Sequence, residues 1–194
     1  STNLFSQEAI TQQNINQAVN AWLIDSVSTE AIYGHISDWD VSSVTSMDYM
    51  FSNTSWGISS SFNGDISNWD VSNVTDMAYM FNGASSFNGD ISSWNVSNVT
   101  DMQAMFFNSE SFNGDISNWN VSNVTNMSEL FREAYNFNIN LSSWNVSNVT
   151  DMSYMFSNAF DFNGDLSSWD VSNVTNMTYM FRSTEVFNGD LSGW

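Results

Sequence analysis

Tryptophan recurs at a fixed spacing along most of the chain. From residue 69 onward the tryptophans follow one another at intervals of 25 residues: Trp69, Trp94, Trp119, Trp144, Trp169 and Trp194. Trp39 precedes this series by 30 residues, and the five extra residues fall within 52–61. A period of this length is the signature of a repeat architecture, in which each unit buries its apolar side chains only by stacking on its neighbours.

Each unit combines two apolar periods. The unit at residues 91–115 reads ISSWNVSNVTDMQAMFFNSESFNGD, and Ile91 defines position 1. Positions 4 and 6 alternate as in a strand, whereas positions 12, 15 and 16 have the spacing of a short helix. Threonine at position 10 suits the N-cap of that helix. We therefore expect a repeat solenoid with one short parallel strand and one short helix in each coil.

The chain divides into a cap and an array. Residues 1–35 are predicted to form an N-terminal cap with an amphipathic capping helix, because the apolar residues between 15 and 23 have helical spacing. Residues 36–194 are predicted to form six repeats, the first of 30 residues, followed by a partial seventh. The periodic tryptophans are expected to point into the core; the alternative is an exposed aromatic platform for sugars.

The repeat resembles a known family of bacterial proteins. The segment I-x-x-W-x-V matches L-x-x-L-x-L, the strand signature of leucine-rich repeats. Over residues 36–194 the pattern W-[DN]-V-S-N-V-T-[DN]-M-x-x-M-F resembles the BspA-like leucine-rich repeat surface proteins, in the branch built on W-D-V-S-N-V-T-D-M units. This resemblance implies a leucine-rich-repeat-like fold, a secreted or cell-surface location, a role in adhesion, and no family catalytic residues.

Charge and composition exclude several functions. The formal net charge is −19, with two basic residues, and such a surface repels nucleic acid and anionic membranes. No apolar run approaches the roughly 20 residues of a membrane helix, so membrane insertion is not expected. With no cysteine, no lysine and one histidine, acid–base and nucleophilic catalysis have few candidates, so we expect no enzyme.

Polar residues recur on the outside of the predicted coils. Positions 2, 3, 5 and 7 should form a flat polar strand face that binds a ligand. Its candidate residues are Asp70, Ser72, Ser92, Asn95, Ser97, Asn120, Ser122, Asn145 and Asp170. Acidic residues at position 25 could form a cation ladder that holds calcium, namely Asp65, Asp90, Asp115, Asp165 and Asp190. The alternative is that these residues only form turns and caps. If stacked Asp side chains repel one another, their pKa values should be raised.

These features together predict a non-catalytic extracellular or cell-surface module for adhesion. It would bind a protein or glycan on another surface through the polar face, without a cofactor other than calcium. One alternative is a structural protein that assembles end to end into a fibre or coat through self-association of its C-terminal coil. A minor alternative is an ice-binding solenoid.

Overall fold

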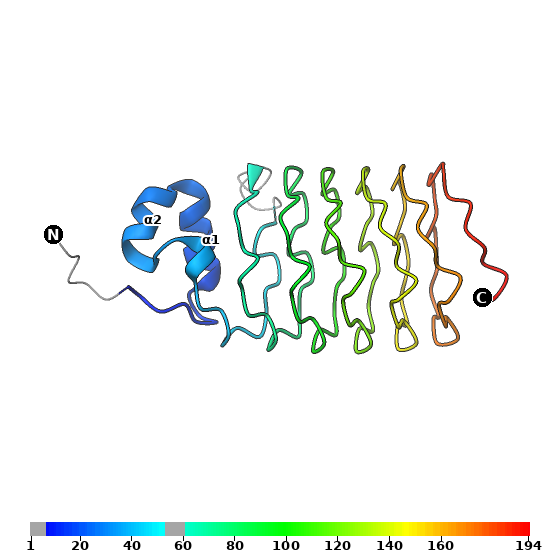
Figure 1. Cartoon of the computed structure of the whole chain (residues 1–194), viewed down its shortest axis with the longest axis horizontal. Helices are drawn as coiled ribbons and strands as arrows, with labels where there is room; N and C mark the ends of the chain where they lie inside the picture. Colours follow the sequence, from blue (N-terminus) through cyan, green and yellow to red (C-terminus); the bar gives the residue numbers. More distant parts are fainter. Residues whose placement is uncertain (1–6, 53–60) are drawn as a thin grey trace.

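A row of stacked coils follows an N-terminal pair of helices. The computed structural model describes residues 7–52 and 61–194. In Figure 1 the helices lie at one end of the long axis, the coils follow in sequence order, and the C-terminus lies on the last coil. The predicted five-residue insertion within 52–61 falls mostly outside the described residues.

Two helices form the cap where the sequence predicted one. Helix α1 spans Ile15–Ile24 and buries the residues of the predicted apolar stripe that face the first coil. Helix α2 spans Ser26–Tyr33, and a single 3-10 turn, Ile36–Asp38, follows it. Asp25 is the N-cap of α2, and its carboxylate accepts the N–H of Ser28 at 3.1 Å. No helix in the described part of the chain has the length and apolar character needed to cross a membrane.

The side-chain amide of Gln12 joins the cap to the first coil. Its Oε1 accepts the N–H groups of Thr45 and Ser46, each at 2.9 Å, and its Nε2 donates to the carbonyl of Ser46 at 3.0 Å. Because a primary amide offers the same donor and acceptor as a peptide group, Gln12 supplies the backbone pairing that a preceding coil would otherwise provide.

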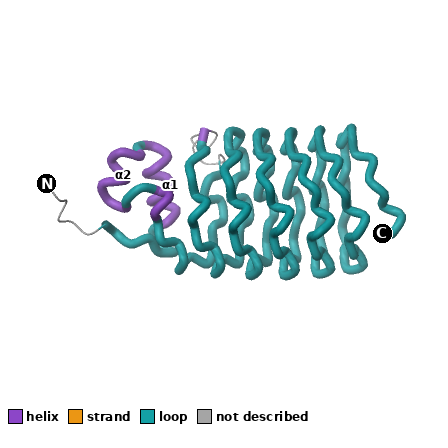
Figure 2. The backbone as a smooth tube through the Cα atoms, in the orientation of Figure 1, coloured by secondary structure: helices purple, strands orange, loops and turns teal. Residues whose placement is uncertain are grey.

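In the described parts of the repeats, residues 36–52 and 61–194, neither the predicted strands nor the predicted helices are present. Figure 2 draws the repeats almost entirely as loops and turns. Across residues 36–52 and 61–194 the only parallel pairing assigned is a series of five single bridges at position 11, such as Asp76 with Asp101. The expectation of a leucine-rich-repeat-like solenoid built from strands and helices is therefore wrong.

Alternating backbone conformations replace both elements. Positions 14 and 18 have left-handed φ angles, for example 51° at Ala104 and 54° at Asn108. A left-handed residue ends a helix or a strand, so positions 12–18 fold as consecutive tight turns. The N–H groups of alternate residues then face the next coil: Met102 donates to the carbonyl of Asn126 at 3.0 Å, and Ala104 to that of Ser128 at 2.8 Å.

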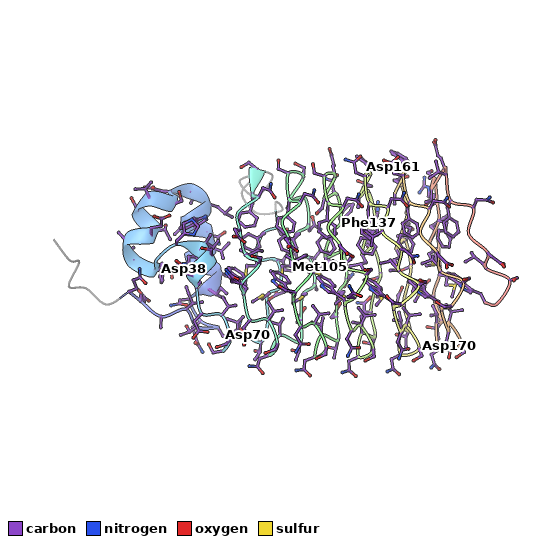
Figure 3. The ribbon with its side chains drawn as sticks, in the orientation of Figure 1. Asp38, Asp70, Met105, Phe137, Asp161 and Asp170 are labelled. Carbon is purple, nitrogen blue, oxygen red and sulfur yellow. The ribbon has the colours of Figure 1, made fainter. Side chains whose placement is uncertain are left out.

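Aromatic rings stack along the inside of the array. Six tryptophans of the periodic series are at most 4 % exposed, which confirms the prediction that they point into the core: Trp39, Trp69, Trp94, Trp119, Trp144 and Trp169. The indole N–H of Trp119 donates to the carbonyl of Ile91 in the preceding coil at 3.1 Å. Phenylalanines at positions 16 and 22 form parallel stacks, and Figure 3 shows Phe137 and Met105 inside the coils. These rows make one continuous core out of units that could not fold alone.

Candidate functional site

The first row of polar turns lies at positions 5 to 7 and holds most of the predicted ligand face. In each turn, Oδ1 of the Asp or Asn accepts the N–H of the serine two residues later, as in Asp70 with Ser72 at 3.0 Å. Figure 3 shows Asp70 and Asp170 along the same long edge of the array. The predicted residues in this row are Asp70, Asn95, Asn120, Asn145 and Asp170, all exposed, and Ser72, Ser97 and Ser122 beside them.

The second row, at positions 25 and 2, contains the predicted cation ladder. Oδ1 of Asp90 accepts both the N–H of Ser92 at 3.0 Å and its hydroxyl at 2.7 Å. Ser92 therefore belongs to this turn, and the single flat face predicted from positions 2, 3, 5 and 7 is in fact two separate rows of turns. The same Asp–Ser turn occurs at Asp65, Asp115, Asp165 and Asp190. In the unit at 116–140, Asn140 occupies the position and accepts the N–H of Ser142 at 2.9 Å.

Hydrogen bonds within these turns decide how the carboxylates titrate. The hydroxyl of Ser92, and then its N–H, lower the pKa of Asp90 below its ordinary value, while burial and the charge of Asp65 oppose them more weakly. The pKa values of Asp65, Asp70, Asp115, Asp165, Asp170 and Asp190 are lowered for the same reason. The expectation that stacking raises these pKa values is therefore wrong. At position 11 the half-buried Asp76 differs, because desolvation raises its pKa.

We expect the lowered pKa values to make the fold sensitive to acid. A carboxylate whose folded pKa is depressed stabilises the fold above its unfolded pKa, and this contribution is lost as pH falls below about 3.8. In the double variant Asp90→Asn/Asp115→Asn, the melting temperature should fall less steeply below this pH than in the parent chain. Asn140 shows that an amide forms the same turn.

Melting curves between pH 7 and pH 2.5 measure this difference. The control is Asp161→Asn, which removes one exposed charge from a side chain that makes no turn hydrogen bond with the described residues. A melting temperature of the parent chain that rises steadily down to pH 3 would show that charge repulsion outweighs the Asp–Ser hydrogen bonds.

A ready-made metal centre is absent from residues 7–52 and 61–194, in which no three His, Cys, Asp or Glu side chains come together to hold an ion. In the Asp–Ser turns at position 25, it is Oδ1 of the carboxylate that accepts the serine N–H. Calcium binding along Asp65, Asp90, Asp115, Asp165 and Asp190 remains a hypothesis.

Two rows of side chains link the coils, and sequence reasoning missed this role. The amide Nδ2 of Asn98 donates to the carbonyl of Ser72 in the preceding coil at 2.7 Å, and the hydroxyl of Thr100 donates to the carbonyl of Thr75 at 3.1 Å. The prediction of Thr as a helix N-cap is wrong, because no helix follows it. The sequence feature that could have indicated this role is the constancy of two polar positions: position 8 is Asn and position 10 is Thr in every unit from residue 66 to residue 190.

One arginine organises an aromatic cluster that was also missed. The guanidinium carbon of Arg132 lies 5.0 Å from the ring centroid of Phe107 and 5.3 Å from that of Tyr154, and its Nη1 is 2.9 Å from Glu129. The three coils that contribute these residues are consecutive. Tyr and Arg are common at the energetic centres of protein interfaces, so this cluster is a second candidate contact surface. The unit at 116–140 departs from the repeat pattern by carrying Glu129, Arg132 and Glu133, and these charged residues could have indicated the cluster.

Sequence comparison identifies related sequences at the level of a family. The profile of the family described as "Mycoplasma protein of unknown function, DUF285" matches residues 26–128 and again residues 114–194. The two matches together cover the array and helix α2. Comparisons with curated proteins and with solved structures found no match.

Proposed function

The chain belongs to the DUF285 family, and we propose that it is a non-catalytic adhesion module, secreted or displayed on a cell surface, that binds a protein or glycan through its rows of polar turns. The resemblance of its units to the W-D-V-S-N-V-T-D-M branch of BspA-like surface proteins supports this proposal. The coils of this chain consist of stacked turns, which distinguishes it from a repeat protein built on strands.

The observation that carries the proposal is the repetition of one exposed turn geometry at positions 5 to 7. Asp70, Asn95, Asn120, Asn145 and Asp170 present side chains of equal length from consecutive coils, and each is oriented by the same hydrogen bond to a backbone N–H. Side chains held in this way lose little conformational freedom when a ligand binds. A regular row of this kind suits an extended ligand that also repeats.

The charge of the chain restricts the chemistry of the partner. The formal net charge of −19 attracts cationic groups and repels anionic ones. The partner is therefore expected to offer hydroxyl or amide groups to the Asn and Ser side chains, and basic groups to the Asp side chains that flank them in the row, Asp70 and Asp170.

Paired charge substitutions test this function. Asp70→Asn/Asp170→Asn removes two charges from the row and retains the turn, since Asn95 has the same hydrogen bond at 3.2 Å. Binding is first screened on glycan arrays and extracellular-matrix proteins, and then measured by calorimetry with calcium and with a chelator. We expect the double variant to weaken binding of a basic ligand about tenfold, because two charge–charge contacts are lost.

The control substitution is Asp161→Asn, whose side chain lies on the opposite edge of the array in Figure 3, away from Asp70 and Asp170. It should leave the affinity unchanged. Equal loss in both variants would mean that only the overall charge matters, and the proposal for the row would fail. Binding that is lost with the chelator would instead support calcium at the ladder.

A further inference from the structure

Position 11 is where the backbones of consecutive coils form their parallel bridges, and its side chains are half-buried. Along the array this row reads Ser46, Asp76, Asp101, Asn126, Asp151 and Asn176. From Asp101 onward carboxylate and amide alternate from coil to coil. Asp76 and Asp101 are therefore the only two carboxylates that are neighbours in this row.

The alternation gives each carboxylate from Asp101 onward a donor from the following coil. Nδ2 of Asn126 donates to Oδ2 of Asp101 at 3.4 Å, and Nδ2 of Asn176 donates to Oδ2 of Asp151 at 3.0 Å. Oδ1 is used within the coil, where it accepts the N–H two residues later, as in Asp101 with Gln103 at 2.8 Å. The Oδ2 and Nδ2 atoms are therefore the ones that make contacts between coils in this row.

Asp76 lacks such a donor. Its Oδ1 accepts the N–H of Ala78 at 2.9 Å, and no donor from the described residues bonds to its Oδ2. Position 13 of this coil is Ala78, so it cannot supply the serine hydroxyl that donates to Asp151 at 2.6 Å in a later coil. The nearby charges that act on Asp76 are the carboxylates of Asp48 in the preceding coil and Asp101 in the following one.

Burial and like charge act on Asp76 in the same direction. Burial raises the pKa of Asp76 most, and the hydrogen bond from Ala78 opposes this effect. The charges of Asp101 and Asp48 raise the pKa further. Burial has the same effect on Asp151, but the hydrogen bonds from its serine and asparagine partners outweigh it, so its pKa is lowered. Among the described residues, no basic side chain forms an ion pair with any of these carboxylates.

We propose that Asp76 and Asp101 hold one proton between them and so form an acid-strengthened joint between the coils at 66–90 and 91–115. The Oδ2 hydroxyl of one carboxyl group then donates to Oδ2 of the other, as the Asn126 amide donates to Asp101 from the opposite side. Neighbouring carboxylates share a proton because their repulsion favours the protonation of one of them. The proton comes from the solvent and turns a repulsive contact into an attractive one. The joint is not part of the polar turns, so it can fail without affecting the proposed adhesion function.

The joint should gain strength in mild acid. A carboxyl group whose folded pKa is raised costs stability at neutral pH, and this cost disappears as the pH falls through that folded pKa, which lies above 3.8. The Asp–Ser turns, whose pKa values are lowered, keep their charge to lower pH. The interval between pH 7 and about 4 therefore separates the joint from the turns.

The substitution Asp76→Asn tests the joint. It extends the alternation of carboxylate and amide along the row, so its melting temperature should exceed that of the parent chain at pH 7, and the difference should shrink as the pH approaches 4. The matched control Asp151→Asn makes the same change where the carboxylate already has its donor, and it places an amide against that of Asn176. This control should melt at a lower temperature than the parent chain at pH 7. A lower melting temperature for Asp76→Asn at pH 7, or a difference that does not change with pH, would contradict the proposal.

Titration of the carboxyl carbons by carbon-13 NMR shows whether the proton is shared. The Asp76 carboxyl should titrate at higher pH than that of Asp151. In the variant Asp101→Asn, which removes the neighbouring charge, the midpoint of Asp76 should fall by about one pH unit. An unchanged midpoint would mean that burial alone raises it, and the shared proton would be ruled out. Calcium in excess at pH 7 should leave the melting temperatures of the parent chain and Asp76→Asn equally affected. If calcium stabilises only the parent chain, the pair binds a metal ion and the proposal is wrong.

Discussion

Replacement of Trp119 by alanine should lower the free energy of unfolding by about 3–5 kcal/mol, the range for a buried tryptophan. Trp119 is 4 % exposed, its ring stacks parallel to that of Trp94 at a centroid distance of 6.5 Å, and its indole donates to the carbonyl of Ile91. The substitution therefore removes the ring contacts to Trp94 and Phe106 in the preceding coil and leaves a cavity in the middle of the array, where neighbouring coils cannot close it without breaking their own pairing.

A second substitution separates packing from hydrogen bonding. Trp119→Phe retains a ring but leaves the carbonyl of Ile91 without the indole donor, so it should cost about 1–3 kcal/mol. Asn118→Ala changes the exposed neighbouring residue and should alter stability by less than about 0.5 kcal/mol. Urea unfolding followed by circular dichroism measures all three. A loss below about 1 kcal/mol for Trp119→Ala would mean that the tryptophan row contributes little to the core.

The periodicity predicted which residues are buried but not how the backbone buries them. Trp94, Val96, Met102 and Phe106 are all in the core, as expected from their positions. Spacings of three and four residues were interpreted as a helix, but consecutive turns also bring such residues to one side. Short apolar runs do not distinguish these cases. The residue types at these positions do not predict a left-handed φ angle. Glu129, for example, has a φ of 59°, a conformation that residues with bulky side chains rarely adopt.

The sequence predicted which residues form the candidate site but not how their side chains are arranged. The Asp and Asn rows were identified from the repeat, and the alternative that they form turns describes the hydrogen bonds of Asp90 and Asn120. The contacts between coils could not be derived, because they depend on which N–H groups face the next coil. The same limitation hid the link made by Asn98.

Asn123→Asp should destabilise the array by about 2 kcal/mol at neutral pH. The amide Nδ2 of Asn123 donates to the carbonyl of Ser97 at 2.7 Å, so a carboxylate would place an acceptor against an acceptor. The same bond joins the neighbouring coils at Asn98 and Asn148, which indicates that this donor sets the spacing of the stack on this side. Urea unfolding at pH 7 measures the loss.

The matched control is Asn120→Asp, which makes the same chemical change three residues earlier. Position 5 already holds aspartate at Asp70 and Asp170, where Oδ1 accepts a backbone N–H, so this variant should be within about 0.5 kcal/mol of the parent. The two variants should also respond oppositely to acid. At position 123 the protonated carboxyl can donate to Ser97, so its folded pKa is raised and the destabilisation disappears as pH falls below about 4. At position 120 the hydrogen bond favours the charged form, so the variant gains nothing from acid. If both variants are equally unstable at pH 7, added charge rather than the lost donor is the cause, and the asparagine row does not hold the coils together.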